Sequence, residues 1–164
     1  MNIDFKYDSI AALIAAAEAA GEPLSALVLR QQAIQLEKTE QEVFDQMADT
    51  YKVMAACIEP GCAEDLRSTS GLTGGSAFKM RRAVESGKTL TGGVLGGALY
   101  RALAVSELNA AMGRVVAAPT AGSCGILPAA LLTMQNDLGC SEHDCVMALF
   151  TASAVGMEIG RAHV

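Results

Sequence analysis

The stretch TEQEVFDQMADTYKVM, residues 39–54, decides the fold class, because a helix start signal is followed there by one apolar helical face. Thr39 and Glu42 have the spacing of a capping box, in which each side chain accepts a hydrogen bond from the other residue's backbone N–H. The apolar residues that follow recur every three to four positions, which places them on one side of a helix. They are Val43, Met47, Tyr51 and Met54. Pro60 and Gly61 are expected to stop this helix.

Helical patterns continue on both sides of this stretch, and no segment has a convincing strand pattern. The further expected helices span residues 8–20, 24–34, 77–86, 95–112, 126–138 and 141 onward. Glycines mark several of their ends, and Gly113 is expected in the left-handed position after residues 95–112. Pro128 lies in a first turn, where a helix tolerates proline, and Ser141 with Asp144 resembles a second capping pair.

The predicted fold class is therefore all-α, a compact bundle of about six to seven helices with two Gly-rich loops. A length of 164 residues fits one domain. The last residues, MEIGRAHV, follow an apolar run without a stop signal. We therefore expect residues 1–164 to be an incomplete, N-terminal portion of a larger helical domain.

Composition excludes several classes of protein. A net charge of −6 and a pI near 4.8 would repel a phosphate backbone, so nucleic acid is not an expected partner. The first eight residues have no basic segment leading into an apolar run, which argues against a signal peptide and for a cytoplasmic protein. Residues 115–134 are uncharged, but Pro119 and Pro128 interrupt them, so we expect a buried loop and helix and no membrane span.

Two Gly-rich loops stand out as candidate binding sites. RSTSGLTGGSAFK, residues 67–79, places hydroxyls, backbone N–H groups and Lys79 before a helix, as a carboxylate or phosphate site would. AAPTAGSCG, residues 117–125, places Thr120, Ser123 and Cys124 before the next helix, so the two loops could face one another. Plain connecting loops are the alternative, and neither histidine gives Ser123 or Cys124 a nucleophile's context.

Other chemistry-bearing residues have simpler explanations. The five cysteines are an odd number, and the spacings 57/62 and 140/145 do not match common zinc or cluster sites, so buried thiols are expected. Glu107 and Asn109 lie on an otherwise apolar helix. Glu107 could serve as an acid or base, but a solvated polar strip shared with Ser106 and Asn109 is the favoured interpretation.

The strings TSGLTGGSAFKM and ELNAAMGRVVAAPTAGSCGILPAALL, residues 69–80 and 107–132, closely resemble the α chain of bacterial iron-sulfur L-serine dehydratases. SGKTLTGGVLGGA and ALFTASAVG, residues 86–98 and 148–156, match in the same order, so the resemblance runs from about residue 39 to 156. It implies a largely helical α domain that works with a β domain or subunit. It also implies an L-serine ammonia-lyase that forms pyruvate and ammonia without pyridoxal.

In that family a [4Fe-4S] cluster is held by three cysteines, and its open iron acts as a Lewis acid on the serine hydroxyl. The family's Gly-Gly-Cys-Gln and Cys-Asp-Pro segments do not occur in this chain, and Cys124 is not taken as a ligand. We therefore expect no metal site and no bound cofactor in this chain alone, which would be inactive by itself. The catalytic residues, including the general base, are left unassigned.

The resemblance implies a set of residues around the carboxylate or ammonium of L-serine. They are Ser68, Ser70, Thr73, Gly74, Gly75, Lys79, Thr120, Gly122 and Ser123. The expected partners are L-serine, the β part and, through exposed apolar surface, further copies of the chain. The alternatives are a noncatalytic helical assembly or regulatory subunit derived from the family, and an elimination on another hydroxy amino acid such as threonine.

Overall fold

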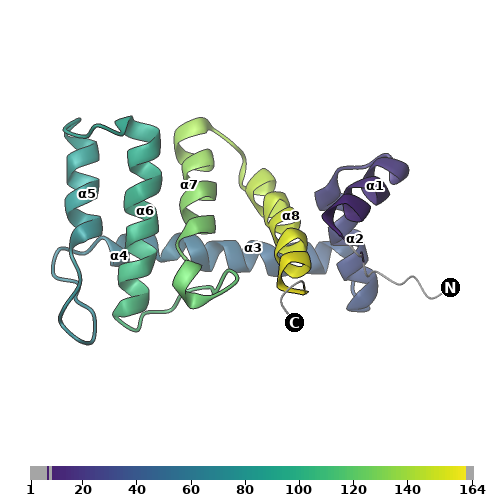
Figure 1. Cartoon of the computed structure of the whole chain (residues 1–164), viewed down its shortest axis with the longest axis horizontal. Coiled ribbons are helices and arrows are strands. Elements are labelled where there is room, and N and C mark those ends of the chain that lie inside the picture. Colours follow the sequence, from purple (N-terminus) through teal and green to yellow (C-terminus); the bar gives the residue numbers. More distant parts are fainter. Residues whose placement is uncertain (1–6, 8, 162–164) are drawn as a thin grey trace. The chain divides into compact units, whose positions relative to one another are not determined.

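The computed structural model describes residue 7 and residues 9–161, with side chains up to Met157, and every regular element in this part of the chain is helical (Figure 1). The elements are α1 (Ile10–Ala20), α2 (Leu24–Gln35), α3 (Glu40–Ala56), α4 (Ile58–Gly61), α5 (Ser76–Glu85), α6 (Gly92–Ala110), the 3-10 helix η1 (Ala121–Ser123), α7 (Ile126–Leu138) and α8 (Glu142–Arg161). Seven of these α-helices are longer than the single turn of α4, which confirms the all-α prediction. Asp8, the expected first helical residue, lies outside the described residues.

The chain divides into two units, residues 1–48 with 146–164, and residues 49–145. In the first unit, the Ser9 hydroxyl accepts a hydrogen bond from Ala12 N at 3.1 Å and so caps α1. Gly21 ends α1 in the left-handed conformation (φ +66°), as the sequence predicts. Buried Leu13 and Ala17 of α1 and Leu27 and Val28 of α2 form the apolar interior.

The predicted capping box is present at the start of α3. Glu42 N donates to Thr39 Oγ1 at 3.2 Å, and Thr39 N donates to Glu42 Oε2 at 2.9 Å.

Among the described residues no single helix is long and apolar enough to span a membrane. Only α1 and α2 taken together reach that length, and they are bent by 95° relative to each other.

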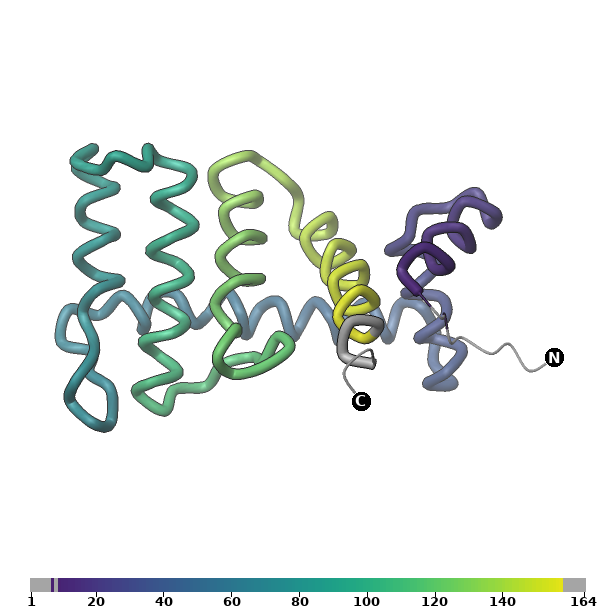
Figure 2. Tube along the Cα trace, viewed as in Figure 1, coloured from purple at the N-terminus to yellow at the C-terminus, as the bar shows by residue number. Residues whose placement is uncertain are grey.

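In the second unit α6 lies between α5 and α7, and the three helices run side by side (Figure 2). Glycines let the backbones approach closely. A Cβ on Gly61 of α4 would lie 2.1 Å from Ala104 O of α6, and one on Gly125, just before α7, would lie 2.6 Å from Ala102 O. Because no side chain fits at either point, glycine at 61 and 125 fixes how α4 and α7 pack on α6.

A buried ion pair joins α6 to α7. Arg101, 6% exposed, donates to both carboxylate oxygens of Asp137, at 2.7 and 3.2 Å, and to Thr133 Oγ1 at 2.8 Å. Burial opposes the charge of Arg101, but these hydrogen bonds and the nearby carboxylate raise its pKa further above its ordinary value. Gly97 leaves room for the pair, because a Cβ at this position would lie 2.8 Å from Asp137 Oδ2.

Three sequence-based expectations about this region need correction. α3 already ends at Ala56, and Pro60 and Gly61 lie inside the single turn α4. Met112, not Gly113, adopts the left-handed conformation after α6 (φ +62°); Gly113 is needed for space, because its Cβ would lie 2.3 Å from Leu108 Cδ1. Residues 119–122 are exposed, so burial within residues 115–134 is limited to Cys124, Gly125 and one face of α7.

The close approach of α4 to α6 predicts that Gly61→Ala lowers the free energy of unfolding by about 1–3 kcal/mol, as overpacking of a dense interior does. The matched control is Gly93→Ala in α6, where a Cβ would meet no atom within 4 Å. That change should be neutral or stabilising by about 0.5–1 kcal/mol. Urea unfolding followed by circular dichroism measures both, and equal effects would contradict the packing argument.

The two capping carboxylates predict an acid-sensitive fold. Hydrogen bonds from Thr39 lower the pKa of Glu42 below 4.5, and those from Ser141 lower the pKa of Asp144 below 3.8. Their stabilisation is complete above these unfolded-state values and is lost as the pH falls through the lower folded-state values. The double variant Glu42→Gln/Asp144→Asn should therefore lose less stability than the wild type between pH 6 and pH 3 (roughly the carboxylate titration range), measured as urea midpoints.

Candidate functional site

The first Gly-rich loop joins α4 to α5 and folds into a tight turn. Ser68 N donates to Thr73 O at 2.8 Å, Thr73 N donates to Ser68 Oγ at 3.2 Å, and the hydroxyls of Ser68 and Ser70 are 3.1 Å apart. Gly74 (φ +139°) cannot carry a side chain, because its Cβ would lie 2.1 Å from Leu66 O. The turn therefore brings the hydroxyls of Ser68 and Ser70 together and holds the backbone of Thr73 beside them, all in an exposed or half-buried position.

The second loop leads into α7 and is closed by its own side chains. Thr120 Oγ1 accepts from Ser123 N at 3.3 Å, Ser123 Oγ accepts from Thr120 N at 3.3 Å, and the two hydroxyls are 3.1 Å apart. The Ser123 hydroxyl also donates a hydrogen bond to Ala118 O at 3.0 Å. Gly122 is exposed at the outside of this loop.

Glu107 of α6 lies at the N-terminus of α5. Its side chain is 8% exposed and accepts hydrogen bonds from the backbone N–H groups of Gly75, Ser76 and Ala77, at 3.1, 2.8 and 3.2 Å. The start of a helix has unpaired N–H groups and a positive dipole end, so a carboxylate is stabilised there. The interpretation of Glu107 as part of a solvated strip is therefore wrong, although Ser106 beside it is exposed.

A spacing signal in the sequence could have identified Glu107. Arg101, Ala104 and Glu107 recur every three residues, and all three are buried. A carboxylate that continues the buried side of a helix needs hydrogen-bond donors. The Gly-rich loop before α5 supplies them, but only the fold brings that loop to α6.

The last turn of α6 holds both loops. Glu107 binds the end of the first loop, and Ala110 O accepts a hydrogen bond from Thr69 N at 3.1 Å. Asn109 Nδ2 donates to Ala121 O of the second loop at 3.1 Å. The structure thus ties both Gly-rich loops to one helical turn, and eight of the nine predicted binding residues lie in these two loops.

This arrangement limits where an external anion could bind. The N–H groups of residues 75–77, which are part of the anion site expected in loop 67–79, already bind the carboxylate of Glu107. The groups that remain for a small polar ligand are the loop hydroxyls, which can each donate one hydrogen bond and accept others.

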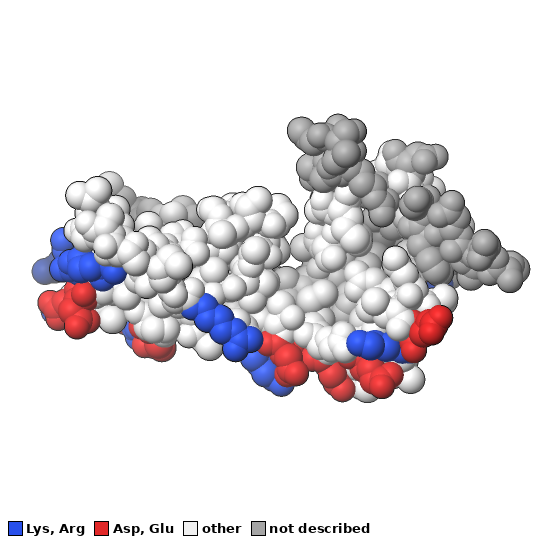
Figure 3. All heavy atoms as spheres, turned by 90° about the horizontal axis from the view of Figure 1, so that it is seen from below, with Lys and Arg blue, Asp and Glu red and all other residues white. Residues whose placement is uncertain are grey.

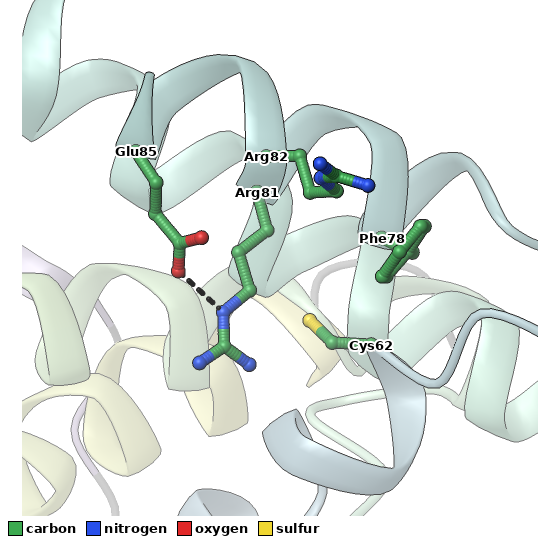
Figure 4. A pocket seen from close by; sticks show the side chains of 5 residues that line it. All are labelled: Cys62, Phe78, Arg81, Arg82 and Glu85. Atoms are coloured by element: carbon green, nitrogen blue, oxygen red, sulfur yellow. Dashed lines mark hydrogen bonds and ion pairs between the residues drawn. The ribbon is translucent and has the colours of Figure 1, made fainter. Parts of the chain in front are cut away.

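Lys79 lies apart from these hydroxyls, on the exposed side of α5. It lines a shallow hollow together with Arg82, Ser86 and Lys88. A neighbouring hollow of about 320 Å³ is lined by Cys62, Phe78, Arg81, Arg82 and Glu85 (Figure 4). Arg81 is held there by Glu85 at 2.9 Å and Glu59 at 3.0 Å, so it belongs to a surface ion-pair network.

The cysteines do not fit an iron-sulfur cluster. Cys57, Cys62, Cys124 and Cys145 are buried, as expected, and burial raises the pKa of each thiol. Cys140, which was also expected to be buried, is only half-buried. A cluster needs thiolates gathered around one point. The Cys57 thiol instead donates to Val53 O at 3.1 Å, and within the described part of the chain no group of three His, Cys, Asp or Glu side chains could hold a metal ion.

We predict that Glu107→Gln lowers the free energy of unfolding by about 1–3 kcal/mol, because the amide NH₂ would face a backbone N–H and leave a buried donor unpaired. Amide hydrogen exchange at residues 75–77 should accelerate in parallel. Ser106→Ala, one position away on the exposed side, should change the unfolding free energy by less than about 0.5 kcal/mol. A Gln variant as stable as the wild type would show that the carboxylate is dispensable.

Comparisons with known proteins agree with the resemblance of the loop strings. The model of the family "Serine dehydratase alpha chain" matches residues 19–163. The probable L-serine dehydratase alpha chain of Bacillus subtilis is 38% identical over 136 residues, which cover 83% of this chain and 45% of that protein. The L-serine dehydratase alpha chain of Peptoniphilus asaccharolyticus is 30% identical over 133 residues, covering 81% and 46%.

L-serine dehydratase 2 of Escherichia coli is 34% identical over 166 residues, covering 95% of this chain and 35% of that protein. The chain spans less than half the length of these curated relatives. No solved structure gives a significant match. The family match covers both Gly-rich loops and the turn of α6 that holds them, and the chain belongs to the serine dehydratase alpha chain family.

Proposed function

We propose that this chain supplies the substrate-binding loops of an L-serine ammonia-lyase that acts together with a β chain or β domain. The observation that carries the proposal is that two hydroxyl-rich loops, both inside the family match, are tied to the same turn of α6. The names of the relatives support the substrate, and the words "alpha chain" in two of them support a β partner.

The loop hydroxyls suit the polar groups of L-serine. Its carboxylate can accept hydrogen bonds from Ser68, Ser70 and Thr73, while its ammonium can donate to Thr120 and Ser123. Gly74 and Gly75, both with positive φ, allow the conformation of the first loop, and Gly122 lies beside the Thr120 hydroxyl in the second. Lys79 adds positive potential from α5. Two loops fixed on one helical turn would hold the substrate in one orientation before the reaction.

The reaction removes the α-proton to a base and the β-hydroxyl from the neighbouring carbon, which leaves aminoacrylate. Aminoacrylate rearranges to the imine, and water hydrolyses the imine to pyruvate and ammonia. The described thiols do not fit a [4Fe-4S] cluster, so we propose that the cluster of the complete enzyme is held by residues other than these. The loops then bind and orient the substrate.

The test is pyruvate formation from L-serine by the complete protein with its β partner, after anaerobic reconstitution with iron and sulfide. We expect Ser70→Ala and Thr120→Ala each to raise KM for L-serine about tenfold or more, the loss of one hydrogen bond to a charged group. Ser86→Ala, an exposed serine at the end of α5, is the matched control and should leave KM unchanged.

Absence of pyruvate despite an assembled cluster would overturn the activity and favour the noncatalytic assembly subunit. Faster formation of 2-oxobutyrate from L-threonine would overturn the choice of substrate. An active enzyme in which both loop variants keep the wild-type KM would separate the activity from the loops and reject them as the binding site.

A further inference from the structure

The second Gly-rich loop carries no charge, so no ion pair can hold it in place. Residues 115–134 contain no Asp, Glu, Lys or Arg. Both loops lie at the lower end of α5, α6 and α7 in Figure 1. Figure 3 shows the surface from below, where charged side chains gather along one side. Neutral hydrogen bonds and packing are therefore what fix the second loop on the rest of its unit.

Packing holds the end of this loop that adjoins α7. Cys124 is fully buried, and a Cβ on Gly125 would lie 2.6 Å from a backbone oxygen of α6. Residues 119–122, by contrast, are exposed. The hydrogen bonds between Thr120 and Ser123 close the loop on itself but do not attach it to another element. The exposed part therefore needs a hydrogen bond from outside the loop to stay in one place.

Asn109 supplies this hydrogen bond from α6. Its Nδ2 donates to Ala121 O, one residue after Thr120, at 3.1 Å. A carbonyl oxygen can only accept, so the amide NH₂ must face it, and this fixes how the half-buried side chain is turned. At the next position of α6, Ala110 O accepts from Thr69 N of the first loop, also at 3.1 Å. Asn109 thus holds the second loop beside the point where the tip of the first loop is attached.

The carboxylate of Glu107 cannot replace this contact. Residues two positions apart lie on nearly opposite sides of a helix and do not face each other. Glu107 is bound to the backbone N–H groups of residues 75–77, at the end of the first loop. Asn109 therefore holds the second loop independently of Glu107, and a change at Asn109 is expected to affect one loop and spare the other.

We propose that Asn109 is a positioning residue of the substrate site. Its amide holds Ala121 so that the neighbouring Thr120 hydroxyl meets the ammonium of L-serine. This inference rests on the proposed function, in which the second loop binds the ammonium. Asn109 acts through Thr120 and does not itself touch the substrate. Without its hydrogen bond, the exposed part of the loop would have to be ordered when the substrate binds, which weakens binding.

The kinetics of the complete protein with its β partner on L-serine test the proposal. Asn109→Ala removes the amide, and Asn109→Asp keeps its shape but places a carboxylate oxygen opposite Ala121 O. Each should raise KM about three- to tenfold, the effect of losing one neutral hydrogen bond. Asn136→Ala, which changes an exposed asparagine of α7, is the matched control and should leave KM unchanged.

A double-mutant cycle separates positioning from a general loss of structure. In a Thr120→Ala background, Asn109→Ala should raise KM by less than about twofold, because the hydroxyl that it positions is gone. In a Ser70→Ala background it should have its full effect, since Ser70 belongs to the other loop. In the chain itself, Asn109→Ala should accelerate amide hydrogen exchange at residues 120–123 and leave it unchanged at residues 75–77.

Two results would overturn the role of Asn109 while leaving the loops as the binding site. They are a wild-type KM in both Asn109 variants, and an equal effect of Asn109→Ala in the two backgrounds. A wild-type KM in Ser70→Ala and Thr120→Ala would overturn the proposed function and this inference with it. Circular dichroism checks the fold of each variant, and Asn109→Asp takes the place of Asn109→Ala in the cycle if the latter loses helix.

Discussion

The carboxylate of Glu107 at the start of α5 is the interaction on which the second unit depends. Three backbone N–H groups converge on it, at 2.8 to 3.2 Å, in a site almost closed to water. Charge-assisted hydrogen bonds are strong there, and the same donors would be costly to bury unpaired. One side chain therefore joins α6, the beginning of α5 and the end of the first Gly-rich loop.

The core and the candidate site share one helix. α6 packs against α4, α5 and α7, and its last turn holds both loops. Its buried polar groups are matched within the fold: Arg101 with Asp137 and Thr133, and Glu107 with the α5 backbone. A shift of α6 would therefore disturb the interior and both loops at the same time, because both are in direct contact with this helix.

Sequence signals between neighbouring residues predicted the helices well, whereas interactions between residues far apart in the sequence were not predicted. The capping pairs Thr39–Glu42 and Ser141–Asp144, and the bounds of α7, depend on residues three or four apart, which a sequence shows directly. Glu107 was misread because its donors lie about thirty residues away on another element. Gly113 was assigned to a helix end for its backbone freedom, whereas the structure uses its missing Cβ to accommodate Leu108.

The hydroxyls of Thr120 and Ser123 bind each other and the backbone of their own loop. Loss of either would loosen the turn that leads into α7, whether or not the protein still turns over a substrate. Selection for folding alone is thus enough to preserve this part of the motif over evolutionary time. A descendant that had lost its catalytic partner would keep the same residues, so this motif is stronger evidence of common ancestry than of activity.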